Sequence, residues 1–276
     1  MNCKPALMLS TLLVLCACAT KGANELVRLP EAKGATLTSC TDLTTRFAFA
    51  NTTLASAEGV AAGSLTLGGK PVSEHCLVKG AMFKRTGSDG KEYAIGFEMR
   101  LPKDWNGRYY YQGNGGLDGS VVTAQGALGG GPITGALVQG FAVISSDAGH
   151  TGAQTTAFGF EPAARLDYGY QAVDKLTPMA KNLIKTAYGK LPDRSYIGGC
   201  SNGGRHTLVA AARYADQYDG FLAGAPGYNL PKAAVANIWS SQQFAKIMTA
   251  RATEPRGNST IADLSTGFTA TERPTV

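Results

Sequence analysis

Histidine is scarce in this chain, because only His75, His150 and His206 occur among its 276 residues. The three are dispersed and form no His-Glu-x-x-His pattern, so they provide no ligand set for metal catalysis. The formal net charge is +6, but no run of lysine or arginine concentrates it. This scatter argues against a nucleic-acid partner. The N-terminal apolar run is too short for a membrane-spanning helix.

The N-terminus has the pattern of an export signal. Lys4 gives a positive start, and an apolar stretch over residues 6–15 is followed by small residues. Ala-Cys-Ala at 17–19 suits an ordinary signal peptidase, whereas Leu-Cys-Ala-Cys at 15–18 is similar to a lipoprotein box. The second alternative would lipidate Cys18 and attach the protein to a membrane. Both alternatives predict a secreted or periplasmic protein, with residues 1–19 outside the fold.

Export places the remaining cysteines, Cys40, Cys76 and Cys200, in an oxidising compartment. We expect Cys40 to pair with Cys76. Closing a loop of that length would stabilise the fold by roughly 3–4 kcal/mol. Cys200 is then left unpaired, directly beside Ser201.

The most informative stretch is Gly-Cys-Ser-Asn-Gly at 199–203. An expected strand over 194–198 precedes it, and the helix-forming run Leu-Val-Ala-Ala-Ala at 208–212 follows. Small residues two before and two after the serine are a steric requirement of the turn that presents a nucleophile between a strand and a helix. In a chain with 35 glycines the motif alone is weak, and a plain glycine turn is the alternative. The flanking elements favour Ser201 as the nucleophile.

Strands and helices alternate through the middle of the chain. Residues 21 to about 80 are expected to be loop-rich, with short strand-like runs such as 65–67. Further strands are expected at 93–101, 108–112, 141–144 and 220–224, the last of them buried. A helix is expected over 170–188, and Pro178 should kink or restart it.

This alternation predicts an α/β fold, with a mostly parallel sheet and helices on both faces. Three loops then leave the carboxyl ends of strands: the glycine loop after Gln112, the 147–150 loop and the Ser201 turn. Sites in such sheets are built at that edge.

A serine nucleophile needs amide donors for the developing oxyanion, a base and an orienting carboxylate. The backbone amides of Asn202 and Gly113 are the predicted donors, with a flexible turn as the alternative for the glycine loop. A dinucleotide site is a poorer interpretation, because Asp118 stands where the third glycine of that fingerprint should be.

The base is difficult to assign. His206 follows Ser201 by five residues on the same helix, about 140° around its axis, and is expected to point away as a partly buried or surface residue. His150 is expected to order a pocket or loop, hydrogen-bonded to Asp147. His75 is expected to lie on the loop of Cys76.

The acid is equally unassigned, because Asp219 precedes a strand at the wrong end of the sheet. The next candidate, Asp263, lies in a Ser/Thr-rich C-terminal stretch.

Several separated segments form a further pattern. In chain order they are Glu-His-Cys at 74–76, Trp-Asn-Gly-Arg at 105–108, Ser-Asp-Ala-Gly-His at 146–150, Arg-Leu-Asp-Tyr-Gly-Tyr at 165–170, Gly-Cys-Ser-Asn-Gly-Gly-Arg at 199–205 and Ala-Gly-Ala-Pro at 223–226. Together they resemble the tannase and feruloyl esterase family. The resemblance implies an α/β-hydrolase core with Ser201 as nucleophile, Gly113 and Asn202 as oxyanion donors, and a disulfide between Cys40 and Cys76. The match looks nearest to members that act on terephthaloyl esters.

The chain also departs from the pattern of that family. In the family a cysteine before the serine pairs with one after the catalytic histidine, and Cys200 matches the first of these. Its partner, the acid, the histidine and the calcium-binding lid are expected to be missing from about Arg251 onward, so no cofactor or metal is expected. Residues 20–250 are therefore predicted to be a partial α/β-hydrolase domain whose C-terminal part is missing. Residues 251–276 are predicted to be a disordered or frame-shifted tail.

The sequence as a whole predicts an exported carboxylic ester hydrolase. Its substrate would be a small-molecule aromatic acid ester of feruloyl, galloyl or terephthaloyl type, hydrolysed through an acyl-enzyme on Ser201. The alternative is a non-catalytic, truncated exported lipoprotein or binding module that retains the fold. A serine peptidase on the same fold is the third interpretation.

Overall fold

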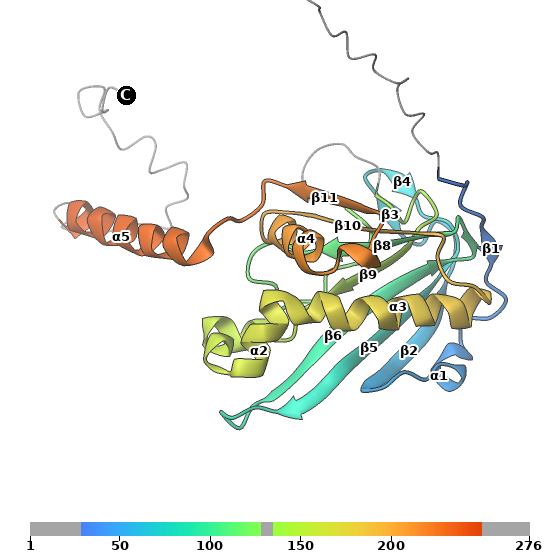
Figure 1. Ribbon diagram of the computed structural model, residues 1–276, viewed down its shortest axis with the longest axis horizontal. Coiled ribbons are helices and arrows are strands. Elements are labelled where there is room, and N and C mark those ends of the chain that lie inside the picture. The colour runs from blue at the N-terminus through green and yellow to red at the C-terminus, as the bar shows by residue number, and fades with distance from the viewer. Residues whose placement is uncertain (1–28, 128–134, 250–276) are drawn as a thin grey trace, which may run out of the picture.

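A seven-stranded mixed sheet forms the centre of the protein (Figure 1). The computed structural model describes residues 29–127 and 135–249, so the predicted signal and the predicted tail lie outside the described residues. The strands of the sheet, in spatial order, are β11 (Gly220–Gly224), β10 (Arg194–Cys200), β8 (Arg108–Gly113), β9 (Ala142–Ser146), β6 (Glu92–Pro102), β5 (His75–Thr86) and β2 (Thr52–Val60).

Half of this sheet is parallel and half is antiparallel. Strands β11, β10, β8 and β9 run parallel to one another, whereas β6, β5 and β2 pair antiparallel. The parallel half contains the predicted strands at 108–112, 141–144, 194–198 and 220–224, each found within two residues of its expected ends. The strand predicted at 93–101 is likewise confirmed as β6.

The expectation of a loop-rich region up to residue 80 is wrong for two long strands. Strand β2 is rich in threonine, alanine and serine and has no clear alternation of large apolar residues. Its pairing with β5 along nearly its whole length specifies it as a strand instead. His75 and Cys76 therefore begin a buried strand rather than decorate a loop.

The two faces of the sheet carry separate apolar clusters. Tyr109 and Tyr111 belong to the larger cluster, while Tyr110 between them belongs to the smaller one, because successive strand residues point to opposite faces. On the larger cluster lie the helices α1 (Leu43–Arg46), α3 (Ala172–Tyr188) and α4 (Asn202–Arg213) (Figure 1).

The smaller cluster is covered without a helix in the described residues. The hairpin of β3 (Thr66–Leu67) and β4 (Lys70–Pro71) packs there through Leu65 and Leu67. Ala124, Leu137 and Val138 from the long connection between β8 and β9 complete it. Helices were expected on both faces of the sheet, and within the described ranges they cover one face.

Helix α3 continues through Pro178 without restarting. Proline removes one hydrogen bond from a helix, but the apolar face of α3, including Leu176, Met179 and Leu183, is fully buried on both sides of it. This packing keeps one helix. It is preceded by the 3-10 helix η1 (Gly152–Phe160), by α2 (Pro162–Leu166) and by the π-helical turn η2 (Asp167–Gln171).

The chain leaves the body after β11. The prediction that this strand is buried is wrong, because Leu222 is 54% exposed and β11 pairs with β10 alone among the described strands. The 3-10 helix η3 (Ala215–Gln217) precedes β11, and α5 (Leu230–Thr249) projects from the body (Figure 1). No helix in the described ranges is both long and apolar enough to span a bilayer.

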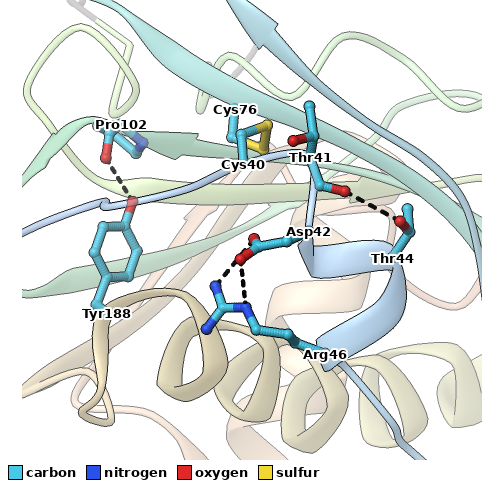
Figure 2. Close-up of a disulfide and its surroundings, with 8 residues drawn as sticks. All are labelled: Cys40, Thr41, Asp42, Thr44, Arg46, Cys76, Pro102 and Tyr188. Atoms are coloured by element: carbon cyan, nitrogen blue, oxygen red, sulfur yellow. Dashed lines mark hydrogen bonds and ion pairs between the residues drawn. A yellow bond between two sulfur atoms is a disulfide. The ribbon is translucent and has the colours of Figure 1, made fainter.

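The predicted disulfide between Cys40 and Cys76 is confirmed (Figure 2). It joins the segment before α1 to the start of β5. Nearby, the Tyr188 hydroxyl at the end of α3 donates to the Pro102 carbonyl at 2.6 Å. The short strands β1 (Ala35–Thr36) and β7 (Asp104–Trp105) pair with each other and tie the N-terminal segment to the same end of the sheet.

Candidate active site

Ser201 lies at the junction of β10 and α4 in a backbone conformation that is rare for serine. Its φ is +57° and its ψ is −119°, a strained combination of the kind that clusters at functional sites. Two hydrogen bonds of 3.0 Å fix the turn. The Ser201 amide donates to the carbonyl of Gly224, the last residue of β11, and the Gly227 amide donates to the Ser201 carbonyl. The residue is exposed. Its side chain is thus presented to solvent by a rigid turn.

The glycines around the serine are required by close backbone packing. A Cβ on Gly203 would lie 2.2 Å from the Gly113 carbonyl oxygen, and one on Gly199 would lie 2.4 Å from the same atom. The end of β8 therefore packs directly against the turn. The structure brings together the predicted nucleophile and the predicted oxyanion loop, as the elbow motif requires.

The start of that loop is tied to the end of β9. The Asn114 side-chain amide donates to the Ser145 hydroxyl at 3.0 Å and to the Ser146 carbonyl at 2.8 Å. Gln112 in turn donates to the Asn114 side-chain oxygen at 3.0 Å. Buried hydrogen bonds thus join the carboxyl end of β8 to the carboxyl end of β9, on either side of Gly113 in the chain.

A buried contact between Asp118 and His206, which the sequence did not lead us to expect, lies where α4 faces the glycine loop. The Asp118 carboxylate lies 2.8 Å from His206 Nε2 and accepts a 2.6 Å hydrogen bond from Asn202 Nδ2. The prediction that His206 is a partly buried or surface residue is wrong, because its side chain is 4% exposed and faces Asp118. Asn202 and His206 are four residues apart on α4, so both face the glycine loop. The single signal in the sequence was an acidic residue at the end of that loop.

The side-chain oxygen of Asn202 also has two hydrogen-bond donors. Asn202 Oδ1 accepts from Arg205 Nε at 2.7 Å and from the Tyr168 hydroxyl at 3.1 Å. Arg205 also donates to the carbonyls of Tyr168 and Gly169, both at 3.0 Å. These carbonyls belong to the π-helical turn η2. That turn therefore helps to hold Asn202, the residue after Ser201.

Asp147 and His150 follow β9, but no hydrogen bond between them occurs in the described part of the chain. Instead, Asp147 Oδ1 accepts from the amides of Gly96 and Gly149, both at 2.9 Å. Burial raises the pKa of Asp147 to about 7. His150 stacks on Phe158 with ring centroids 3.6 Å apart, and burial lowers its pKa. The expected bond fails because the carboxylate turns toward the neighbouring strand β6.

Each of the three histidines has contacts of its own. His75 lies 2.8 Å from both the Ser73 carbonyl and Arg100 Nη1. Over residues 29–127 and 135–249, no hydrogen bond joins the Ser201 hydroxyl to a histidine, and no group of three or more His, Cys, Asp or Glu side chains could hold a metal ion.

Cys200 is a free, half-buried thiol. Asp219 accepts from the Ser195 amide at 2.8 Å. It therefore lies near the start of β10, at the end of the strand opposite Ser201, as expected.

A strained serine between a parallel strand and a helix, on a mixed sheet of this order, defines an α/β-hydrolase. The solved structure of feruloyl esterase B from Aspergillus oryzae agrees: it is 27% identical, with a TM-score of 0.59 over 69% of this chain and 37% of that one. The family model "Tannase and feruloyl esterase" matches residues 76–259. The chain therefore belongs to the tannase and feruloyl esterase family.

Curated relatives are similar over part of their length. Mono(2-hydroxyethyl) terephthalate hydrolase of Piscinibacter sakaiensis is 44% identical over 192 residues, which is 67% of this chain and 32% of that protein. A probable feruloyl esterase B-2 of Aspergillus flavus is 34% identical over 47% of this chain and 23% of that protein. This chain thus spans a third or less of the length of these two relatives.

Proposed function

We propose that this chain carries the nucleophile and the oxyanion loop of an exported serine carboxylesterase. The observation that carries the proposal is the strained backbone of Ser201, together with the close packing of Gly199 and Gly203 against the Gly113 carbonyl at the end of β8. Family membership supports ester hydrolysis as the reaction.

In the proposed reaction, the Ser201 oxygen attacks the ester carbonyl carbon and loses its proton to a base. The carbonyl oxygen becomes an oxyanion, which the amides of Gly113 and Asn202 stabilise. Collapse of this intermediate releases the alcohol and leaves an acyl-serine, and water then releases the acid. No cofactor is part of the proposed reaction.

The proposed substrates are small-molecule esters of aromatic acids, of feruloyl, galloyl or terephthaloyl type. The names of the relatives support this class, because they include a terephthalate monoester hydrolase and feruloyl esterases. Export is part of the proposal, with or without lipidation of Cys18. The Cys40–Cys76 disulfide supports it, since such bonds persist in oxidising compartments. Nucleic acid has no part in the proposed function.

One observation favours the alternative of a non-catalytic binding module. All three histidines of the chain make contacts elsewhere, and none is hydrogen-bonded to Ser201 in the described residues. A serine without a base retains only the rate that oxyanion binding supplies.

A fluorophosphonate probe separates the two functions. The full chain is incubated with the probe and analysed by intact mass and peptide mapping, alongside Ser201→Ala and Cys200→Ser. An esterase gains one adduct on Ser201, loses it in Ser201→Ala, and keeps it in Cys200→Ser, the control for a small change at the adjacent residue. A wild-type chain without an adduct would support the binding module.

A further inference from the structure

We propose that Asp118 is a positioning residue that holds both oxyanion donors, Gly113 and Asn202, in register with Ser201. This inference rests on the proposed function, because it concerns the same site. It goes beyond that function because it identifies a carboxylate that positions the two donors while touching neither Ser201 nor the reacting atoms.

The carboxylate points inward from a surface loop. Gly115, Gly116 and Leu117 are exposed, yet the Asp118 side chain is 2% exposed. Its backbone has φ +57°, a conformation that aspartate and asparagine tolerate better than most residues. The Asp118 amide closes a turn onto the Gly115 carbonyl at 3.3 Å. The loop is thus bent so that a carboxyl group enters the protein five residues after Gly113, the predicted oxyanion donor.

The buried carboxylate is held from helix α4. Hydrogen bonds that a carboxylate accepts are among the strong ones, and Asp118 Oδ2 accepts from Asn202 Nδ2 at 2.6 Å and lies 2.8 Å from His206 Nε2. The contact with Asp118 is the shortest polar contact of the His206 ring, since Asn202 and Arg205 are both 3.3 Å from the same nitrogen. Removal of the carboxylate would leave buried polar groups of Asn202 and His206 without their partner.

The connection links the two donors to each other. Asp118 lies on the loop that begins directly after Gly113, the first predicted donor. It accepts a hydrogen bond from the side chain of Asn202, whose backbone amide is the second predicted donor. The opposite end of that side chain is fixed by Arg205 and Tyr168. Release of Asp118 therefore loosens the loop and the first turn of α4 together. A 1 Å error in such a site can cost about a hundredfold in rate.

The test compares Asp118→Gly with Asp118→Asn in the full chain. Both residues accept the positive φ, but only asparagine retains an oxygen that can accept from Asn202 and His206. With the fluorophosphonate probe, we expect the maximal labelling rate of Asp118→Gly to fall about 10- to 100-fold, with the probe concentration for half-maximal rate unchanged. Asp118→Asn should stay within about threefold of wild type.

Two further variants separate positioning from general destabilisation. His206→Leu removes one bond to Asp118 and should slow labelling about tenfold, whereas His206→Gln, which keeps an amide donor, should largely restore it. Thr177→Val is the matched structural control. It removes the Thr177 hydroxyl on α3, which forms buried hydrogen bonds with the Val173 carbonyl and the Tyr218 hydroxyl. This variant should lower the melting temperature without changing the labelling rate.

Amide hydrogen exchange of residues 113–119 and 202–205 gives a readout that needs no activity. Faster exchange there in Asp118→Gly, but not in Thr177→Val, supports the proposal. Wild-type labelling by Asp118→Gly would overturn it while leaving the esterase function in place. If the wild type itself fails to label, the proposed function fails instead. Unchanged exchange in Asp118→Gly would then show that Asp118 does not anchor the loop.

Discussion

Substitution of Gly203 by alanine tests whether the end of β8 and the serine turn must touch. Gly203 lies in the first turn of α4, with its Cα against the Gly113 backbone. An added Cβ would lie 2.2 Å from the Gly113 carbonyl oxygen and 2.6 Å from its carbonyl carbon. Both neighbours are main-chain atoms, so no side-chain rotation relieves the clash. Ordinary contact requires the two backbones to separate by about 1 Å.

The substitution should slow the reaction and also lower the stability of the fold. Overpacking a tight site costs about 1–3 kcal/mol, which lowers the melting temperature of a domain of this size by several degrees, at about 2–4 °C per kcal/mol. A shift of about 1 Å between Gly113 and Ser201 should reduce oxyanion stabilisation enough to slow acylation about a hundredfold. Gly203→Ala should therefore remain folded but react slowly with the fluorophosphonate.

The assay measures the labelling rate at Ser201 and the melting temperature on the same preparation. Gly59→Ala is the control, because no atom lies within 4 Å of a Cβ at that position on β2, and it should match wild type in both measurements. If Gly203→Ala labels at the wild-type rate, contact between β8 and the turn does not set the geometry of the oxyanion site.

Two other predictions concern stability, and a third concerns association. Burial raises the pKa of Asp147 from 3.8 to about 7, so the folded state holds a proton that the unfolded state releases, and stability should fall as the pH rises from about 4 to 7. Asp147→Asn, which can keep both amide bonds through one oxygen, should flatten that dependence in melts at pH 5 and pH 8; equal slopes would count against the assignment. Reduction of the Cys40–Cys76 disulfide should destabilise the fold by about 4 kcal/mol, seen as a lower melting temperature with dithiothreitol and absent in a Cys40→Ala/Cys76→Ala variant. Leu222→Lys on the exposed edge strand β11 should reduce concentration-dependent light scattering, and unchanged scattering would show that this edge does not drive association.

Local patterns predicted the parallel half of the sheet well. The apolar runs of β8, β9 and β10, bounded by glycine and proline, specified these strands within two residues. Strand β2 and the start of β5 lie in the region predicted to be loop-rich, and the threonine, serine and alanine of β2 carry little hydrophobic signal. Pairing between distant segments specifies them instead, and such pairing is invisible in a single window of sequence.

The sequence by itself determined the position of the turn at Ser201, because the steric demand for small residues around that serine acts within a few positions of the chain. It also identified the glycine loop and the two cysteines that pair. Only the tertiary structure decided that His206 is buried against Asp118, since those residues are separated by 88 positions and nothing local relates them. The exposure of β11 was decided in the same way, because a strand is buried by the neighbours it finds in space and not by its own composition.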